Sequence, residues 1–443
     1  MISFTSMQNK LAVLVLGTCG IFLVAFFLAS SIAISSLPTV AAVTISTVSP
    51  SSVGLVNEQN SDIYPFIAHR VRPHCDGSSD CSDGIMAYTA CGNSDCSSGN
   101  ITQTVQHGGW PSVEFYDRGK ALMLYDKWLS ETDYRLVLQR CLDKACSTSN
   151  LTTFPSDYQD IGDHALTVGS DNLPFIVSDQ YTQNPSMLTI IRCRDLDCTQ
   201  YRVTNYQTDL IIDYGLDIAI GSDGFPTISF VERDAATSNS TLRVLKCLNY
   251  ACSNWQVNSV DSGQGVGRYS TLVIQPNGNP LIVYNDMEST WSAWKIKLAS
   301  CGNPFCSADN VITTLLPQNG HNPDITLSAA GLPIIAYTKV DTSNINSLEL
   351  INCSTSNCSS WTTDIVDQGG WGVAKGINPN VSIGQDGSPV IAYMGDYPGM
   401  PSSVLFAKCI DGNISSCSQS VKSLIGDAYY YDNYGVAVSV DAS

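Results

Sequence analysis

The segment SDGFPTISF, from Ser222 to Phe230, followed by LRVLKC up to Cys247 and then by Cys252, decides the fold of this chain. The Asp-Gly pair tolerates the positive φ angles of a tight turn, so it predicts a hairpin just before Pro226. Proline tolerates the first position of the following strand, because its missing N–H costs little there. The apolar run that ends at Cys247 predicts a third strand, and the polar residues after Cys252 predict a fourth.

This unit recurs along the chain. The turn and second strand return in PNGNPLIVY from Pro276, in AAGLPIIAY from Ala329 and in QDGSPVIAY from Gln385. Cysteines return in close pairs, six with the spacing C-x4-C and one with a longer loop: Cys91/Cys96, Cys141/Cys146, Cys193/Cys198, Cys247/Cys252, Cys301/Cys306, Cys353/Cys358 and Cys409/Cys417. The first cysteines of successive pairs are 50, 52, 54, 54, 52 and 56 residues apart. A period of this length is typical of a propeller, a solenoid or an array.

The two ends of the chain predict how the repeats close. Four strands per unit, without a helical pattern, predict a β-propeller blade. The C-terminal YGVAVSVDAS matches a first strand that lacks a second, whereas YPFIAHRV from Tyr64 matches a second strand that lacks a first. A C-terminal strand that completes the N-terminal blade removes the exposed sheet edge. The predicted fold is therefore all-β: a seven-bladed β-propeller of four-stranded antiparallel blades over residues 62–443, preceded by one N-terminal transmembrane helix.

On these motifs the sequence resembles the secreted seven-bladed propellers built from G-x-P-h-I-x-Y and C-x4-C repeats, over residues 62–443. The resemblance is architectural and implies no particular activity. The chain lacks the double glycine of kelch repeats, the WD dipeptide, and the S-x-D-x-G-x-T-W box of sialidases.

The N-terminal region predicts a membrane anchor. Residues 11–36 form an apolar run after Lys10, long enough to cross a hydrocarbon core of about 30 Å. The positive-inside rule leaves residues 1–10 in the cytoplasm and sends the rest outside. Residues 37–61 are rich in Ser and Thr and predict a stalk. The alternative is a signal peptide cleaved after Ala42, which releases the protein from the cell.

Charge and cysteine content restrict partners and compartment. The chain has 22 Lys+Arg against 40 Asp+Glu, and the net charge of −18 repels phosphate backbones and excludes nucleic acid as a partner. Seventeen cysteines are typical of an oxidising compartment. The repeated pairs predict hairpin disulfides rather than zinc sites, because four zinc ligands would have to converge from separate blades. Cys75 and Cys81 are predicted to form one more loop disulfide.

Seven N-x-S/T sequons are consistent with an extracellular location. The candidates for glycosylation are Asn100, Asn150, Asn239, Asn352, Asn357 and Asn413. The seventh, Asn380, lies in an inner strand, so we expect it to be unmodified.

Aromatic residues gather in the loops that open on one propeller face. Those that precede first strands are Trp110, Tyr214, Tyr269, Trp371 and Tyr434, and those between second and third strands are Trp128, Tyr181, Trp291, Trp294 and Tyr397. Exposed aromatics stack on sugar rings or anchor a partner protein, whereas buried ones pack between loops. Both interpretations stay open for this set, and Trp110, Trp371, Tyr214, Tyr269, Trp128, Trp291 and Trp294 are the ligand candidates.

Carboxylates gather on the same face. Five lie at the ends of second strands: Asp126, Asp179, Asp234, Asp286 and Asp396. A pair of them could catalyse glycosidic chemistry, although their recurrence from blade to blade is also typical of loop-capping residues. Asp217 and Asp324 occupy equivalent first-strand positions, where they would ring the channel and either hold Ca²⁺ or contact water.

The sequence therefore favours a non-catalytic, membrane-tethered extracellular module that recognises a glycan, a protein or further copies of itself through one propeller face. We expect this module to need no cofactor; the alternative is that it binds Ca²⁺. The competing hypothesis is a secreted carbohydrate-active hydrolase or lyase that uses the face carboxylates, and a third is a passive spacer.

Overall fold

The computed structural model describes residues 12–16, 21–25, 64–71, 85–130, 133–155, 161–180, 185–287, 293–370, 373–397, 400–410, 417, 419–427 and 436–440. The chain divides into two compact units, Met1–Glu58 and Gln59–Ser443.

In the first unit, β1 (Ala12–Leu16) and β2 (Ile21–Ala25) pair antiparallel. The rest of the predicted transmembrane segment 11–36 lies outside the described residues, as do residues 1–10 and the predicted stalk 37–61. The part of the chain that the structure describes contains no helix that is long and apolar enough to cross a membrane. The anchor and its orientation stay predictions.

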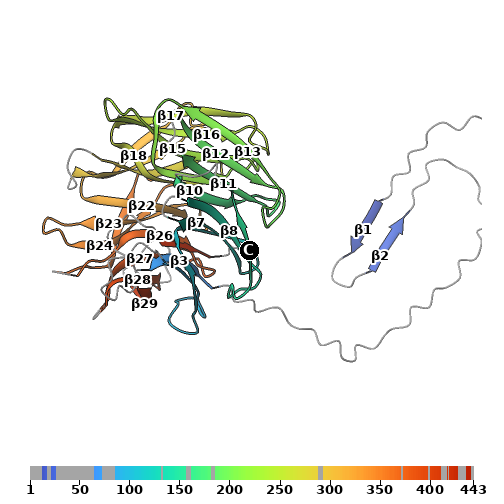
Figure 1. Ribbon diagram of the computed structural model, residues 1–443, viewed down its shortest axis with the longest axis horizontal. Coiled ribbons are helices and arrows are strands. Elements are labelled where there is room, and N and C mark those ends of the chain that lie inside the picture. The colour runs from blue at the N-terminus through green and yellow to red at the C-terminus, as the bar shows by residue number, and fades with distance from the viewer. Residues whose placement is uncertain are drawn as a thin grey trace, which may run out of the picture. The chain divides into compact units, whose positions relative to one another are not determined.

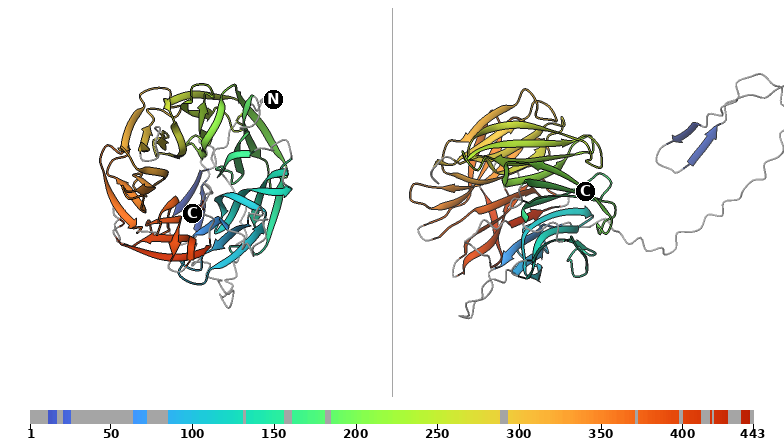
Figure 2. Two further views of the ribbon diagram at one scale, coloured as in Figure 1. Left: turned by 60° about the vertical axis from the view of Figure 1, so that its left-hand side comes forward. Right: turned by 45° about the horizontal axis from the view of Figure 1, so that its top comes forward.

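The second unit contains seven antiparallel sheets of four strands, which confirms the predicted blades. Figure 2 (left) shows these sheets arranged in a ring, and Figure 1 labels many of their strands. We number the blades from the one that contains both ends of the unit. Blade 1 is β30 (Val436–Ser439), β3 (Phe66–Val71), β4 (Ile85–Ala90) and β5 (Ile101–Gln106). Blade 2 is β6 (Gly108–Asp117), β7 (Lys120–Ser130), β8 (Asp133–Cys141) and β9 (Ser149–Thr153).

The other five blades follow in chain order, each from its innermost to its outermost strand. Blade 3 is β10 (Ile161–Val168), β11 (Pro174–Gln180), β12 (Ser186–Cys193) and β13 (Tyr201–Thr208). Blade 4 is β14 (Ile211–Ile220), β15 (Pro226–Arg233), β16 (Asn239–Cys247) and β17 (Trp255–Gln264). Blade 5 is β18 (Val266–Ile274), β19 (Pro280–Asp286), β20 (Lys295–Ser300) and β21 (Val311–Leu316). Blade 6 is β22 (Gly320–Leu327), β23 (Pro333–Val340), β24 (Asn346–Cys353) and β25 (Trp361–Asp367). Blade 7 is β26 (Ile377–Ile383), β27 (Pro389–Tyr397), β28 (Met400–Cys409) and β29 (Ser420–Asp427).

The ring closes as the sequence predicted. Strand β30 pairs antiparallel with β3, with Val438 opposite Ile67 and Ala437 opposite Ala68. Both Val438 and Ile67 belong to an apolar cluster that includes Val390 and Phe406 of blade 7. The last strand of the chain thus completes the first blade and also seals that blade against the last one.

The core lies between the blades rather than inside any one of them. Each of the seven apolar clusters joins two neighbouring blades; for example, Phe175 and Ile190 of blade 3 pack with Ile228 and Phe230 of blade 4. Strands that are buried on both faces of a sheet have near-continuous apolar sequences, as the second and third strands of these blades do. Burial of these faces is the main source of stability.

Seven hairpin disulfides confirm the predicted cysteine pairing. They join Cys91–Cys96, Cys141–Cys146, Cys193–Cys198, Cys247–Cys252, Cys301–Cys306, Cys353–Cys358 and Cys409–Cys417. So many disulfides indicate an oxidising, extracellular environment. Cys75 and Cys81 lie outside the described residues.

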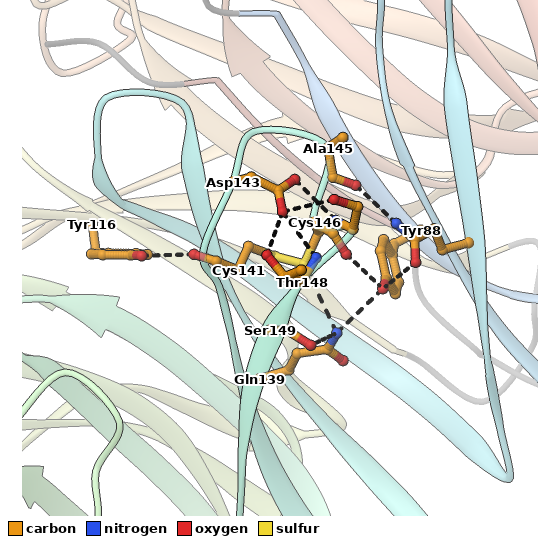
Figure 3. The surroundings of a disulfide bond; sticks show 11 residues. Tyr88, Tyr116, Gln139, Cys141, Asp143, Ala145, Cys146, Thr148 and Ser149 are labelled. Atoms are coloured by element: carbon orange, nitrogen blue, oxygen red, sulfur yellow. Dashed lines mark hydrogen bonds between the residues drawn. A yellow bond between two sulfur atoms is a disulfide. The ribbon is translucent and has the colours of Figure 1, made fainter.

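Each disulfide hairpin is also held by side chains, as Figure 3 shows around Cys141–Cys146. Asp143 accepts hydrogen bonds from the backbone N–H groups of Ser147 and Thr148. The hydroxyl of Tyr88, in blade 1, donates to the carbonyl of Cys146 in blade 2. The hairpin therefore links neighbouring blades as well as closing its own.

The structure separates the sequons by exposure. Asn150, Asn239 and Asn357 are exposed, Asn100 is half-buried, and Asn413 lies outside the described residues. Asn352 is only 3% exposed and its Nδ2 donates to Asp364 Oδ2, which contradicts its choice as a glycosylation candidate. Burial follows from its place in β24, a third strand that packs between blades.

Candidate functional site

The innermost strands share an irregularity near one end. In blades 2 to 7 the register between the first and second strand shifts there. Within these bulges the backbone is left-handed at equivalent positions, with φ of 46° at Trp110, 122° at Gly215, 52° at Tyr269, 48° at Asn322 and 47° at Asn378. We call these five the mouth residues. Glycine and asparagine adopt this conformation readily, but for a bulky side chain it is an outlier that stores strain.

Four of the mouth residues line a cavity of about 210 Å³, which we call the mouth cavity. Its wall comes from six innermost strands: β10, β14, β18, β22, β26 and β30. The side chains in this wall include Asp163, Tyr269, Asn322, Asp324 and Asn378.

A larger cavity of about 630 Å³ is lined by the innermost strands of all seven blades, so it is the central channel. The two cavities share His164, Thr271, Asp324 and Asn380 in their walls. The mouth cavity is therefore one end of the channel.

An aromatic stack lies beside the mouth cavity. Tyr214 is 50% exposed and stacks on Tyr269, with ring centroids 6.4 Å apart and planes 15° from parallel. Tyr269 stacks in turn on Trp294 at 6.1 Å. Trp294 is only 6% exposed and lies 4.7 Å from the ring of His321. This burial agrees with the interpretation that it packs between loops and contradicts its choice as a ligand candidate. Trp294 is the buried end of the aromatic stack, and Tyr214 is its exposed end.

A second aromatic group forms around Arg70. The guanidinium carbon of Arg70 lies 4.6 Å from the ring centroid of Trp128 and 5.8 Å from that of Trp110. Trp110 and Trp128 meet edge to face at 5.9 Å. Both rings are half-buried and already have aromatic and cationic neighbours. The other predicted ligand candidates, Trp291 and Trp371, lie outside the described residues, as do Tyr181 and Tyr434.

Two of the predicted strand-end carboxylates, Asp126 and Asp179, contact residues of β10 that line the mouth cavity. Asp179 Oδ1 accepts a 2.6 Å hydrogen bond from the backbone N–H of Asp163, and Asp163 Oδ2 accepts one of 2.7 Å from Gly215. Asp126 Oδ1 lies 3.5 Å from His164 Nδ1. Burial raises the pKa of Asp126 well above its usual range, raises that of Asp163, and lowers that of His164 to about 4. Asp163 is the carboxylate of this group that lines the cavity.

The remaining strand-end aspartates have structural partners. Asp234 Oδ1 caps a turn by accepting from the N–H of Ala236, and Asp396 Oδ2 accepts from the N–H of Ala374. Asp286 forms an ion pair of 2.7 Å with Lys297. The contacts of Asp234 and Asp396 agree with the loop-capping interpretation.

Asp217 and Asp324, predicted as calcium ligands, contact the neighbouring blades. Asp217 Oδ2 accepts from the N–H of Leu272, and Asp324 Oδ2 accepts from the N–H of Val381. Burial raises the pKa of each carboxyl to about 7. In the described parts of the chain, no group of three or more His, Cys, Asp or Glu side chains is placed to hold a metal ion. The calcium site stays a prediction.

Solved structures resemble this chain at low sequence identity. A crystal structure of a protein of unknown function from Dyadobacter fermentans is 11% identical, covers 72% of this chain and 95% of its own, and has a TM-score of 0.51. An α-L-arabinanase of Penicillium chrysogenum is 13% identical over 72% of this chain and 93% of its own, with a TM-score of 0.46. The Hadza microbial sialidase Hz136 is 12% identical over 65% of this chain and 63% of its own, with a TM-score of 0.45. These similarities concern the fold alone.

No protein-family model and no curated protein matches the chain.

Sequence reasoning missed Asp163, Asn322 and Asn378. A signal for the two asparagines was present in the repeat, since Gly215, Asn322 and Asn378 each stand two residues before Asp217, Asp324 and Asn380. Residues that tolerate positive φ, at one fixed position of successive units, indicate a left-handed bulge.

Proposed function

We propose that this protein is an extracellular binding module, tethered to a membrane through residues 11–36, that recognises a glycan at the mouth of its central channel. The observation that carries the proposal is the exposed Tyr214, stacked on Tyr269 beside the mouth cavity. The seven hairpin disulfides support the extracellular part of the proposal.

The chemistry of the mouth suits a sugar. A sugar ring has an apolar C–H face that packs on an aromatic ring, while its hydroxyls need donors and acceptors. Tyr214 and Tyr269 supply the aromatic surface, and Asp163, Asn322 and Asn378 supply the polar groups within the adjoining cavity. A pocket with an apolar wall and a few convergent polar groups is the usual form of a small-ligand site.

The test is a glycan array probed with the full chain in detergent, followed by titration of the bound glycans. We expect Tyr214→Ala to weaken binding at least about tenfold, the effect of losing about 1.4 kcal/mol of contact. Leu248→Ala is the matched control, because Leu248 is an exposed apolar residue of the same blade in the disulfide hairpin. Unchanged binding by Tyr214→Ala contradicts the proposal.

One observation favours the alternative of a carbohydrate-active hydrolase or lyase. Asp163 lines the cavity while the pKa of nearby Asp126 is raised further by burial, and carboxyls in different environments can divide acid and base roles. Against it, Asp163 is already bonded to Gly215 and Asp126 is buried beside His164. Turnover of a polysaccharide panel, lost in Asp163→Asn, supports the enzyme. We expect no turnover.

A further inference from the structure

We infer that the mouth cavity receives the terminal residue of a neutral glycan chain, end-on, and rejects chains that end in an acidic sugar. This inference rests on the proposed function, because it names the part of the glycan and the class of sugar that the same site binds.

The shape of the cavity wall favours the end of a glycan chain over its interior. Six of the seven innermost strands contribute to it, from β10 through β26 and then β30. A polymer that passes straight across a surface needs a groove open at both ends, whereas strands surround this cavity on nearly all sides. A chain end can enter such a cavity along the channel axis, and an interior residue cannot enter without bending the chain sharply.

The charge of the cavity wall favours a neutral sugar. The described residues that line the mouth cavity include two carboxylates, Asp163 and Asp324, and neither Lys nor Arg. The one imidazole in the wall, His164, has its pKa lowered to about 4 by burial, so it is neutral at physiological pH. Burial raises the pKa of Asp163 and raises that of Asp324 to about 7, so Asp324 is largely ionised only above neutral pH. In that pH range a carboxylate or sulfate on the terminal sugar would lose its water beside like charges in a site of reduced dielectric, which is strongly unfavourable. A neutral sugar has hydroxyls that donate to the same carboxylates.

A pair of side-chain amides in the cavity wall can bind a sugar hydroxyl. Asn322 Nδ2 donates to Asn378 Oδ1, which fixes both side chains at the mouth. Among the described contacts this leaves Asn322 Oδ1 as an acceptor and Asn378 Nδ2 as a donor. A sugar hydroxyl both donates and accepts, so it can bond to the two amides at once. The Tyr269 ring gives the same wall an apolar, aromatic surface for the terminal sugar. Because Tyr214 stacks on Tyr269, it would contact the next sugar of the chain.

Capacity measurements separate end binding from binding along the chain. The probe is a neutral polysaccharide that binds in the array, used intact and after partial hydrolysis, at equal mass. End binding predicts that capacity rises in proportion to the number of chain ends. Equal capacity per mass for the two samples overturns the end-on part of the inference.

Substitutions of Asp324 and Asp217 test whether negative charge at the mouth cavity excludes acidic sugars. The probes are one neutral oligosaccharide and the same oligosaccharide extended by a terminal glucuronic acid. At about pH 8.5, above the raised pKa of Asp324, we expect the native protein to bind the acidic form at least about tenfold more weakly. Asp324→Asn keeps an acceptor for Val381 N–H but removes the charge, so it should reduce this difference several-fold.

Asp217→Asn is the matched control. Asp217 forms the equivalent bond to Leu272 but does not line the mouth cavity, so this variant should keep the native preference. Equal binding of both probes by the native protein, or equal effects of the two variants, overturns the charge argument. Failure of the native protein to bind any glycan instead overturns the proposed function, so the two failures are distinguishable.

Discussion

Asp217, in β14, accepts a 2.7 Å hydrogen bond through Oδ2 from the backbone N–H of Leu272 in β18, the innermost strand of the next blade. Asp324 and Asn380 repeat this contact, accepting from Val381 at 2.6 Å and from Val438 at 2.7 Å. We call these three side chains the inter-blade clasps. Because the bonds cross from one sheet to the next, they add directional contacts to an interface that is otherwise apolar.

The clasps predict how Asp217 tolerates substitution. Asp217→Ala leaves the N–H of Leu272 without its acceptor and should lower the free energy of unfolding by about 1–3 kcal/mol. Asp217→Asn keeps a carbonyl acceptor, as Asn380 does naturally, and should cost much less. Urea denaturation at about pH 6 measures both. Equal losses in the two variants would show that the hydrogen bond contributes nothing.

Buried carboxyls predict that stability falls as the pH rises above neutrality. Burial raises the pKa of Asp217 and Asp324 to about 7 and that of Glu114 to about 8, from ordinary values of 3.8 and 4.5. The folded protein therefore holds protons that the unfolded chain has already released. A group of this kind favours folding at low pH, and its contribution is lost as the pH rises through the folded pKa.

Buried histidines oppose this trend at lower pH. Burial lowers the pKa of His69, His164 and His321 from 6.5 to about 4, so their effect stabilises the fold above about pH 6.5 and is lost toward pH 4. Between about pH 4 and pH 6.5, the stability gained from the histidines offsets the stability lost from the carboxyls. Above about pH 6.5 only the carboxyls still change the stability. We expect the melting temperature to decline between about pH 6.5 and 8.

Glu114→Gln tests the carboxyl contribution. This variant should reduce the decline between about pH 7 and 8, because the residue that titrates there is removed, and should leave the melting temperature near pH 5 almost unchanged. Thermal unfolding across the pH series measures the effect. A parallel shift at every pH would indicate a packing change instead.

The repeat made the fold predictable, including its least local feature. The match of the residues near Tyr64 with the C-terminal strand depends only on where each end of the chain interrupts the unit, so the pairing of β3 with β30 followed from counting. The disulfides followed because each pair lies within one hairpin, where sequence spacing fixes the distance.

The site was less predictable, because it depends on contacts between blades. The sequence placed Asp217 and Asp324 at equivalent positions but not the neighbouring N–H groups that they accept from. It made Trp294 a ligand candidate, yet contact with His321 buries the ring. The φ angles of Trp110 and Tyr269 could not be predicted from residue type, since these residues rarely adopt them.

The left-handed backbone of Tyr269 predicts that glycine at this position gives a more stable protein than alanine, the reverse of the usual order in a strand. Tyr269 has a φ of 52°, whereas the backbone of Tyr214, whose ring stacks on that of Tyr269, is not left-handed. At Tyr269 the Gly variant should be more stable than the Ala variant by about 1 kcal/mol, because glycine adopts positive φ without strain. At Tyr214 the usual order should hold, with Ala the more stable by about 0.5–1 kcal/mol. The same order at both positions would contradict strain at the mouth.

Ring closure gives the last prediction. Val438 lies opposite Ile67 in the β30–β3 pair, is buried against blade 7, and supplies the N–H that Asn380 accepts. Val438→Asp places a carboxylate in that apolar cluster and should lower the free energy of unfolding by about 3 kcal/mol or more. Ser439→Asp, one residue along the same strand, is the control, because Ser439 is half-buried and lies outside the cluster.

Loss of closure should also change the solution behaviour of the protein. With β30 displaced, β3 presents an unpaired edge, and exposed edges associate with other chains. Size-exclusion chromatography should therefore show self-association for Val438→Asp and a single species for Ser439→Asp. If Val438→Asp keeps both the native melting temperature and the native elution volume, then β30 does not hold the ring together, and blades 1 and 7 must be joined by their second to fourth strands alone.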